Sequence, residues 1–294
     1  MHTVDWPFRA AEALDAELLT FRELRRFHRG IYPGVWVPRD VELTMVDQGR
    51  AAWLWSNRAA VLAGLSASAV LGAKWIDPGT PVELVHANRR PPRSIIVHSD
   101  DLLAGETRTA RGLPVTAPAR TAFDIGRRQV LRSGVQRIDA LMNATHLKAV
   151  DVETVASRHP GVRGLRQLRE TLTFVDGGAE SPYESLTRLL LVQAGFPRPE
   201  TQIEVLGEYG NVFARIDMGW RQWQVGVDFE GAQHWTKPEQ FTKDVERYAR
   251  LPELGWIDIR VTSGMLHNTR QAFFRRVGDA LITRGCPRTW PESW

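Results

Sequence analysis

The sequence has one cysteine, little net charge and no long hydrophobic run. Cys286 alone cannot form an internal disulfide or a cysteine-rich zinc site, so we expect a protein of a reducing compartment. The chain has 38 Lys and Arg residues against 34 Asp and Glu residues, which gives a formal net charge of +4. So small an excess does not by itself indicate a nucleic-acid partner, which must be argued from local clusters of charge.

Apolar residues are interrupted too often for a membrane span. The longest apolar stretch, residues 59–73, contains Ser66 and Ser68 and is shorter than the ~20 residues that a bilayer-spanning helix needs. The first residues, MHTVDWPFRAAEALDAELL, contain acids and lack the apolar centre of a signal peptide. We therefore expect a cytoplasmic protein with no membrane partner. Its 294 residues suggest about two domains.

Motifs of three large enzyme classes are also missing. The chain has no GxxxxGK phosphate loop, no GxSxG nucleophile elbow and no HExxH zinc motif. These absences argue against an NTPase, an α/β-hydrolase and a zinc protease.

A basic segment near the N-terminus has the pattern of a short helix followed by a hairpin. Thr20 and Glu23 stand in the Thr-x-x-Glu order of a capping box, which predicts the start of a helix. HRGIYPGVWVPRD, residues 28–40, alternates apolar side chains between Gly and Pro residues, as β-hairpins do. The pattern resembles the end of a winged helix-turn-helix, and it fits equally well a solvated basic face on a small packing subdomain. The arginines of the segment are Arg22, Arg25, Arg26, Arg29 and Arg39.

The region that follows is expected to be mainly helical. Small residues at helical spacing predict a helix over 50–72. Thr116 as N-cap and Pro118 in the first turn predict a second helix through AFDIGRR. Two short strands, 82–86 and 94–98, flank the polar turn NRRPPR. The arginines of this turn form a second basic cluster: Arg89, Arg90 and Arg93.

The segment GGAESP, residues 177–182, is glycine-rich, polar and proline-terminated, which is typical of a domain boundary. We predict an N-terminal domain over 1–176 and a C-terminal domain over 177–294. The elements expected beyond the boundary are a helix at 182–194, a strand at 201–206, a turn at 208–211, strands at 212–218 and 224–230, a helix at 237–254, a strand at 256–261 and a helix at 268–283. This order predicts a mixed sheet flanked by helices, so the fold class is α/β locally and α+β overall.

Carboxylates gather on the predicted C-terminal sheet. Asp228 and Glu230 alternate along one strand and so point to the same face, with Phe229 pointing to the other. If the neighbouring strands pair as a hairpin, Asp217 approaches that face, and Glu184 on the preceding helix adds a fourth carboxylate. Grouped carboxylates repel one another unless a cation lies between them, and ligation by oxygen alone suits Mg²⁺ or Mn²⁺.

A purely structural explanation stays open for each of these acids. Acids on strands are often simply solvent-facing, although Val225 and Val227 indicate a buried strand in which an unpaired acid is costly. Glu184 lies near a helix start, where the helix dipole favours an acid without any function.

Four segments in order resemble the DUF559 domain: ESPYESLTRLLL, ARIDMGW, VGVDFEGAQHW and KDVERYARLPELGW. This domain is related to the very-short-patch-repair endonucleases of the PD-(D/E)XK nuclease-like superfamily, and the resemblance covers residues 178–284. Two earlier segments, WLWSNRAAVLAGLSASAVLGA and GLPVTAPARTAFDIGRR, resemble actinobacterial proteins with an AbiEi-type antitoxin or transcriptional-regulator-like region. The resemblance implies a restriction-endonuclease-like mixed sheet at the C-terminus and a helical N-terminal domain with a winged-helix-like hairpin.

The resemblance also implies roles for individual acids. Glu184 matches the helix acid, Asp217 the motif aspartate and Asp228 the second metal-binding acid, so these three are the expected metal ligands. Glu230 stands where the superfamily has a lysine. The family usually reads Glu-x-Asp-Gly where this chain has Asp-Phe-Glu-Gly, so the longer and shorter acids are exchanged.

Two further residues match polar positions of the domain. In place of the missing lysine, His234 is the expected general base or leaving-group acid. Arg247 is expected to contact phosphate or to hold an acid.

Together these features predict Mg²⁺- or Mn²⁺-dependent hydrolysis of DNA phosphodiester bonds, with Glu184, Asp217, Asp228, Glu230 and His234 as the catalytic set. The alternative is a non-catalytic DNA-binding transcriptional regulator, or a type IV antitoxin-like protein with a cognate toxin partner, built on a degenerate nuclease fold. In both cases basic side chains are expected to bind the DNA backbone. They are Arg22, Arg25, Arg26, Arg29, Arg89, Arg90, Arg93 and Arg247.

Overall fold

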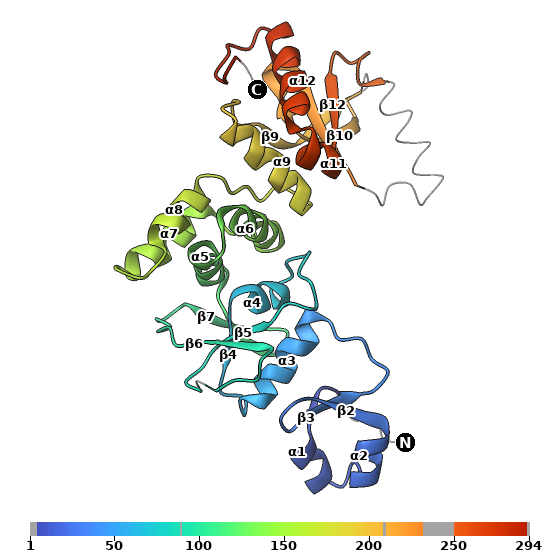
Figure 1. Ribbon diagram of the computed structural model, residues 1–294, viewed down its shortest axis with the longest axis vertical. Helices are drawn as coiled ribbons and strands as arrows, with labels where there is room; N and C mark the ends of the chain where they lie inside the picture. Colours follow the sequence, from blue (N-terminus) through green and yellow to red (C-terminus); the bar gives the residue numbers. More distant parts are fainter. Residues whose placement is uncertain (1–4, 89, 208–209, 232–249, 293–294) are drawn as a thin grey trace. The chain divides into compact units, whose positions relative to one another are not determined.

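The computed structural model divides into two compact units. Figure 1 labels helices and strands of both along the chain. The structure describes residues 5–88, 90–207, 210–231 and 250–292. The first unit comprises Met1–Gln129 and Ala144–Arg169, and the second comprises Val130–Asn143 and Glu170–Trp294. The units therefore interleave along the chain, whereas the boundary predicted from the sequence is a single one near Gly177. None of the helices in the described ranges has both the length and the apolar character needed to cross a membrane.

The first unit contains helices and two sheets. Its elements are β1 (Phe8–Arg9), α1 (Ala10–Asp15), α2 (Phe21–Phe27), β2 (His28–Tyr32), β3 (Val35–Pro38), α3 (Met45–Trp55), β4 (Val61–Leu62), α4 (Gly64–Val70), β5 (Val82–Val85), β6 (Ile95–His98), β7 (Thr107–Ala110), β8 (Leu113–Thr116), α5 (Pro118–Arg128) and α7 (Ala149–Arg158), with α8 (Leu165–Leu172) at its end. The strand orders are β1-β3-β2 and β6-β5-β4-β8-β7. Helices α3 and α4 pack against the larger sheet through a cluster that includes the fully buried Leu62, Leu84 and Val115.

Local sequence signals at the N-terminus are confirmed. The Thr20 N–H donates to Glu23 Oε2 at 2.8 Å, and the Glu23 N–H donates to Thr20 Oγ1 at 3.2 Å, which completes the capping box of α2. Strands β2 and β3 pair as the expected antiparallel hairpin.

Two helix predictions in this unit are wrong in detail. The helix expected over 50–72 ends at Trp55, because Asn57 and Arg58 adopt positive φ angles of 56° and 65°, which no α-helix accommodates. The chain then forms β4 and α4, so this unit is not the helical domain that the small residues suggested. Thr116 does not cap α5, because its Oγ1 lies 2.7 Å from Thr121 Oγ1 and the N-cap is Ala117.

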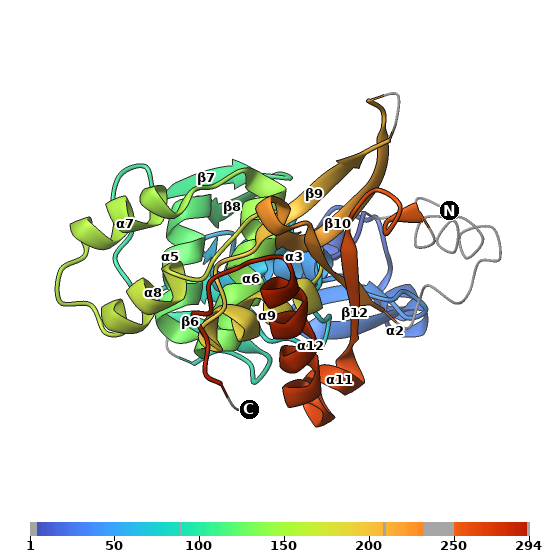
Figure 2. The same cartoon turned by 90° about the horizontal axis from the view of Figure 1, so that it is seen from above.

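The second unit is built on a four-stranded mixed sheet, which confirms the α+β class. Its elements are α6 (Leu131–Thr145), α9 (Pro182–Gln193), β9 (Glu200–Leu206), β10 (Val212–Trp220), the short 3₁₀ helix η1 (Arg221–Trp223), β11 (Val225–Glu230), β12 (Ile257–Thr262), α11 (Ser263–Asn268) and α12 (Arg270–Thr283). The order is β12-β11-β10-β9, in which only β11 and β12 are parallel. Helices α9, α11 and α12 lie beside the sheet (Figure 2) and share one apolar core with Val225 and Val227. Most of the helix expected over 237–254 lies outside the described residues.

A buried ion pair explains why α6 belongs to the second unit. Asp139 on α6 and Arg188 on α9 are each about 1% exposed, and their Oδ2 and Nη2 atoms lie 2.6 Å apart. The Asp176 N–H donates to Asp139 Oδ1 at 2.7 Å. Burial raises the pKa of Asp139 to about 6, although the charge of Arg188 acts in the opposite direction. The pair ties α6 to the helix that opens the C-terminal sheet.

Candidate active site

Asp217 on β10 and Asp228 on β11 hold each other in place through the backbone. The Asp217 N–H donates to Asp228 Oδ1 at 2.8 Å, and the Phe229 N–H donates to Asp217 Oδ2 at 2.8 Å. Asp228 is 4% exposed, and Asp217 is half-buried. The sheet therefore places the two predicted metal-binding aspartates side by side, with one oxygen of each carboxylate fixed by an N–H of the neighbouring strand.

Glu184 is brought to the same place by the first turn of α9. Ser181 caps this helix by accepting the Glu184 N–H at 3.2 Å. The ring of Tyr183 stacks on Phe229 with 4.7 Å between centroids, which holds the start of α9 against the end of β11. Phe229 thus joins the core shared with α9, as expected from its alternation with Asp228.

Glu184 is buried and binds protons more readily than an exposed glutamate. Its Oε2 accepts the Glu180 N–H at 2.8 Å and the Gln202 Nε2–H at 3.2 Å. Burial raises the pKa of Glu184, and the negative charges of Glu180 and Asp228 act in the same direction, while the Glu180 N–H and Ser181 oppose the shift. Glu184 therefore lies close enough to Asp228 for the two charges to influence each other, and we call Asp217, Asp228 and Glu184 together the acid cluster.

Gln202 is a member of this cluster that sequence reasoning missed. On β9 it lies between the paired residues Thr201 and Ile203, opposite Asp217, and its φ angle is 53°. Its Oε1 is buried and accepts no hydrogen bond from the residues that the structure describes. Neither a positive φ angle at a glutamine nor the register between two strands can be read from a local sequence pattern, so only the structure shows that the Gln202 side chain contacts Glu184.

Glu230, the residue at the superfamily's lysine position, contacts an arginine. Its Oε1 lies 3.5 Å from Nε of Arg260 on β12, and the same Nε lies 3.9 Å from Asp258. The Glu230 side chain is 22% exposed. This ion pair gives Glu230 a role in joining β11 to β12, whether or not it also acts with the aspartates.

The side chains that the structure describes have the donor atoms for a hard cation but not the close grouping of a complete site. Across those ranges, no three His, Cys, Asp or Glu side chains are grouped closely enough to hold a metal ion. The donors present are nevertheless all oxygens: two fixed aspartates, a buried glutamate and the Oε1 of Gln202, which accepts no described hydrogen bond. This is the donor chemistry of Mg²⁺ and Mn²⁺. His234 and Arg247 lie outside the described residues, and their roles stay predictions.

The predicted DNA-contacting arginines of the first unit lie mostly at its surface. Arg22, Arg25 and Arg26 are exposed on α2, and the last two lie over the rings of Phe21 and Phe27 at 5.6 and 5.2 Å. Outside this helix the placements differ. Arg90 and Arg93 are exposed, Arg29 is half-buried and donates to the Val41 carbonyl at 3.1 Å, and Arg89 lies outside the described residues.

Arg39 has a structural role. It donates to the carbonyls of Arg25 and Arg26 at 2.9 and 3.2 Å, at the end of α2. Cations at this end of a helix interact favourably with its unpaired carbonyls. The solvated-face and DNA-binding explanations of the other arginines both remain.

Comparison with known proteins gives relatives without a described activity. No family model matches the chain, and no solved structure matches it significantly. Two proteins of Mycobacterium tuberculosis, the uncharacterized protein MT2308 of strain CDC 1551 and the uncharacterized protein Rv2248 of strain H37Rv, are each 29% identical over 198 residues. These residues make up 67% of this chain and 69% of each relative. The resemblance to DUF559 and AbiEi-type proteins therefore stays a prediction.

Replacing Glu184 by glutamine tests whether the ionised carboxylate of this residue destabilises the folded protein. Folding raises the pKa of Glu184 above its ordinary value of 4.5. The group therefore stabilises the folded state fully below pH 4.5, and this stabilisation is lost as the pH rises through the pKa of the folded state. At pH 7 the Glu184→Gln variant is therefore expected to unfold at the same or higher urea concentration, with a gain of up to about 1–2 kcal/mol. A marked loss of stability at pH 7 would show instead that the charged carboxylate holds the fold together.

Proposed function

We propose that the chain is a cytoplasmic, metal-dependent phosphodiesterase that acts on DNA, with its active site in the second unit. The observation that carries the proposal is the pair of hydrogen bonds in which Asp217 and Asp228 each accept a backbone N–H of the other strand. Buried Glu184 and the side chain of Gln202, which donates to it, lie next to this pair. Burying carboxylates next to one another is costly, so their concentration on adjacent strands is better explained by function than by folding. The DNA substrate is supported by the resemblance to very-short-patch-repair endonucleases.

The residues have distinct roles in this proposal. Asp217 and Asp228 would hold a divalent cation, and Gln202 would add an amide oxygen to its surroundings. When bound, such an ion stabilises charge on a phosphate and lowers the pKa of water. Glu184 would accept a proton from the attacking water at a carboxylate oxygen, since its raised pKa brings it closer to the working pH than an ordinary glutamate.

The direct test is nicking of supercoiled plasmid by the purified full chain. Cleavage is expected with Mg²⁺ or Mn²⁺ and not with Ca²⁺ or EDTA, because Ca²⁺ is larger and prefers more ligands than this cluster offers. Linear and mismatched duplexes in parallel reactions identify the preferred substrate. A chain that stays inactive on every DNA in both metals would contradict the proposal.

A second proposal, DNA binding without cleavage, is favoured by the surface of α2. In the part of the chain that the structure describes, Arg22, Arg25 and Arg26 form no ion pair, so their charge is available to phosphates. A regulator or antitoxin-like protein with a toxin partner would bind DNA through this helix. The test is the binding of duplex DNA in EDTA at increasing salt concentrations. Changing all three residues to alanine should make both the affinity and its dependence on salt smaller. Plasmid nicking by the same variant is measured separately.

A further inference from the structure

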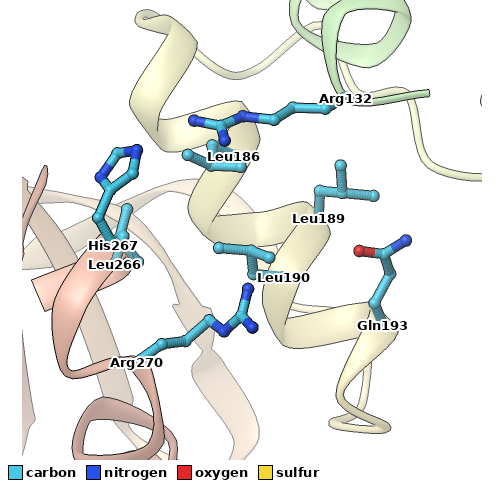
Figure 3. Close-up of a pocket in the computed structure, with 8 residues that line it drawn as sticks. All are labelled: Arg132, Leu186, Leu189, Leu190, Gln193, Leu266, His267 and Arg270. Atoms are coloured by element: carbon cyan, nitrogen blue, oxygen red, sulfur yellow. The ribbon is translucent and has the colours of Figure 1, made fainter. Parts of the chain in front are cut away.

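A pocket in the same unit has a different chemical character from the acid cluster. It lies between α6, α9, α11 and α12 and has a volume of about 290 Å³. Its floor is made by four leucines of α9 and α11, and its rim by polar side chains (Figure 3). The floor residues are Leu186, Leu189, Leu190 and Leu266, and the rim residues are Arg132, Gln193, His267 and Arg270.

The rim is cationic. Figure 3 shows the guanidinium of Arg132 near Leu186 and that of Arg270 near Leu190, so the two charges flank the leucine floor. Neither arginine forms an ion pair with a residue in the described ranges. The Nδ1–H of His267 donates to the Ser263 carbonyl at 2.6 Å, which fixes the orientation of that ring at the rim. Two unneutralised guanidiniums beside an apolar surface are an arrangement that attracts an anion carrying an apolar body.

We infer that this pocket binds a small organic phosphate monoester. Two guanidiniums match the two negative charges of a phosphate monoester better than the single charge of a carboxylate, and a guanidinium can donate two hydrogen bonds to a phosphate. The leucine floor then covers the organic part of the ligand. A volume near 290 Å³ is at the lower end of small-molecule sites and restricts that part to about the size of one ring or one nucleoside.

Calorimetric titration of the full chain with phenyl phosphate tests the inference. Phenyl phosphate is expected to bind at least about tenfold more tightly than inorganic phosphate, which lacks the apolar body, and than benzoate, which lacks the second charge. The Arg132→Ala/Arg270→Ala variant is expected to weaken phenyl phosphate binding at least about tenfold. Both arginines are exposed, so their loss is not expected to unfold the protein, and thermal unfolding checks this.

The matched control is Arg275→Ala/Arg276→Ala, which removes the same charge from exposed positions of α12 that do not line the pocket. Equal weakening in both double variants, or equal affinity for phosphate and phenyl phosphate, would overturn the inference. Competition by adenosine monophosphate would identify a free nucleotide as the source of the phosphate. Competition by a 5′-phosphorylated oligonucleotide, but not by its 5′-hydroxyl form, would identify a DNA end. Neither result depends on whether the acid cluster cleaves DNA.

Discussion

Replacing Asp228 by asparagine is expected to reduce metal-dependent plasmid nicking at least about a thousandfold. A cation held at this site contributes several kcal/mol to the stabilisation of charge in the transition state, and about 4 kcal/mol corresponds to a thousandfold in rate. Asparagine keeps the shape of the side chain but removes one ligand charge. The measurement is the initial rate of nicking at saturating Mg²⁺, with the same substitution at Asp217 as a second case.

The structure explains why Asp228→Asn should fold. The Oδ1 of an asparagine at this position can still accept the Asp217 N–H, so the connection between β10 and β11 survives. A matched control is Asp279→Asn, which changes an exposed acid of α12 and should leave the rate unchanged. Full nicking activity in the Asp228 variant, with an unchanged far-UV spectrum, would remove this residue from the mechanism.

Replacing Arg188 by methionine is expected to destabilise the second unit by about 3–5 kcal/mol, because it leaves the carboxylate of Asp139 buried without its cation. Arg188 also donates to the Phe174 carbonyl, which loses this donor. The free energy of unfolding in urea measures the loss. Arg198→Met is the comparison for a lost arginine without a lost ion pair, because Arg198 donates to the carbonyls of Thr173 and Val175 and forms no ion pair with a residue that the structure describes.

The pH dependence of this loss follows from the shifted pKa of Asp139. Folding raises this pKa from 3.8 to about 6, so the group stabilises the folded state fully below pH 3.8, and that contribution is lost as the pH rises through about 6. Without Arg188 the pKa rises further, so Arg188→Met should be less destabilising at pH 5 than at pH 8. The double variant Asp139→Leu/Arg188→Met should recover much of the stability, since an apolar pair replaces a buried ion pair. Equal losses at both pH values would contradict the account.

Much of the second unit was predictable because its signals are local. The alternation of Val225, Val227 and Phe229 specified a buried strand, and the proline at the start of α9 specified where that helix begins. The first unit was harder, since alanines between Arg50 and Gly72 suit close packing in one helix or two. The left-handed backbone at Asn57 and Arg58, which decides between them, leaves no periodic pattern.

The candidate site was predictable only as far as alternation reaches. The pairing of Asp217 with Asp228 follows from neighbouring strands, and the structure bears it out through backbone hydrogen bonds. The burial of Glu184 and the position of Gln202 depend on tertiary packing and on register with β9. The contact of Glu230 with Arg260 required knowing that β12 is the parallel neighbour of β11.

Manganese binding reports on the acid cluster whether or not the chain is catalytically active. Titration of the full chain with Mn²⁺, followed by electron paramagnetic resonance, should show a site that is lost in Asp217→Asn/Asp228→Asn and retained in Asp279→Asn. If both variants bind Mn²⁺ as the unaltered chain does, or if the unaltered chain binds none, the two aspartates do not form a metal centre.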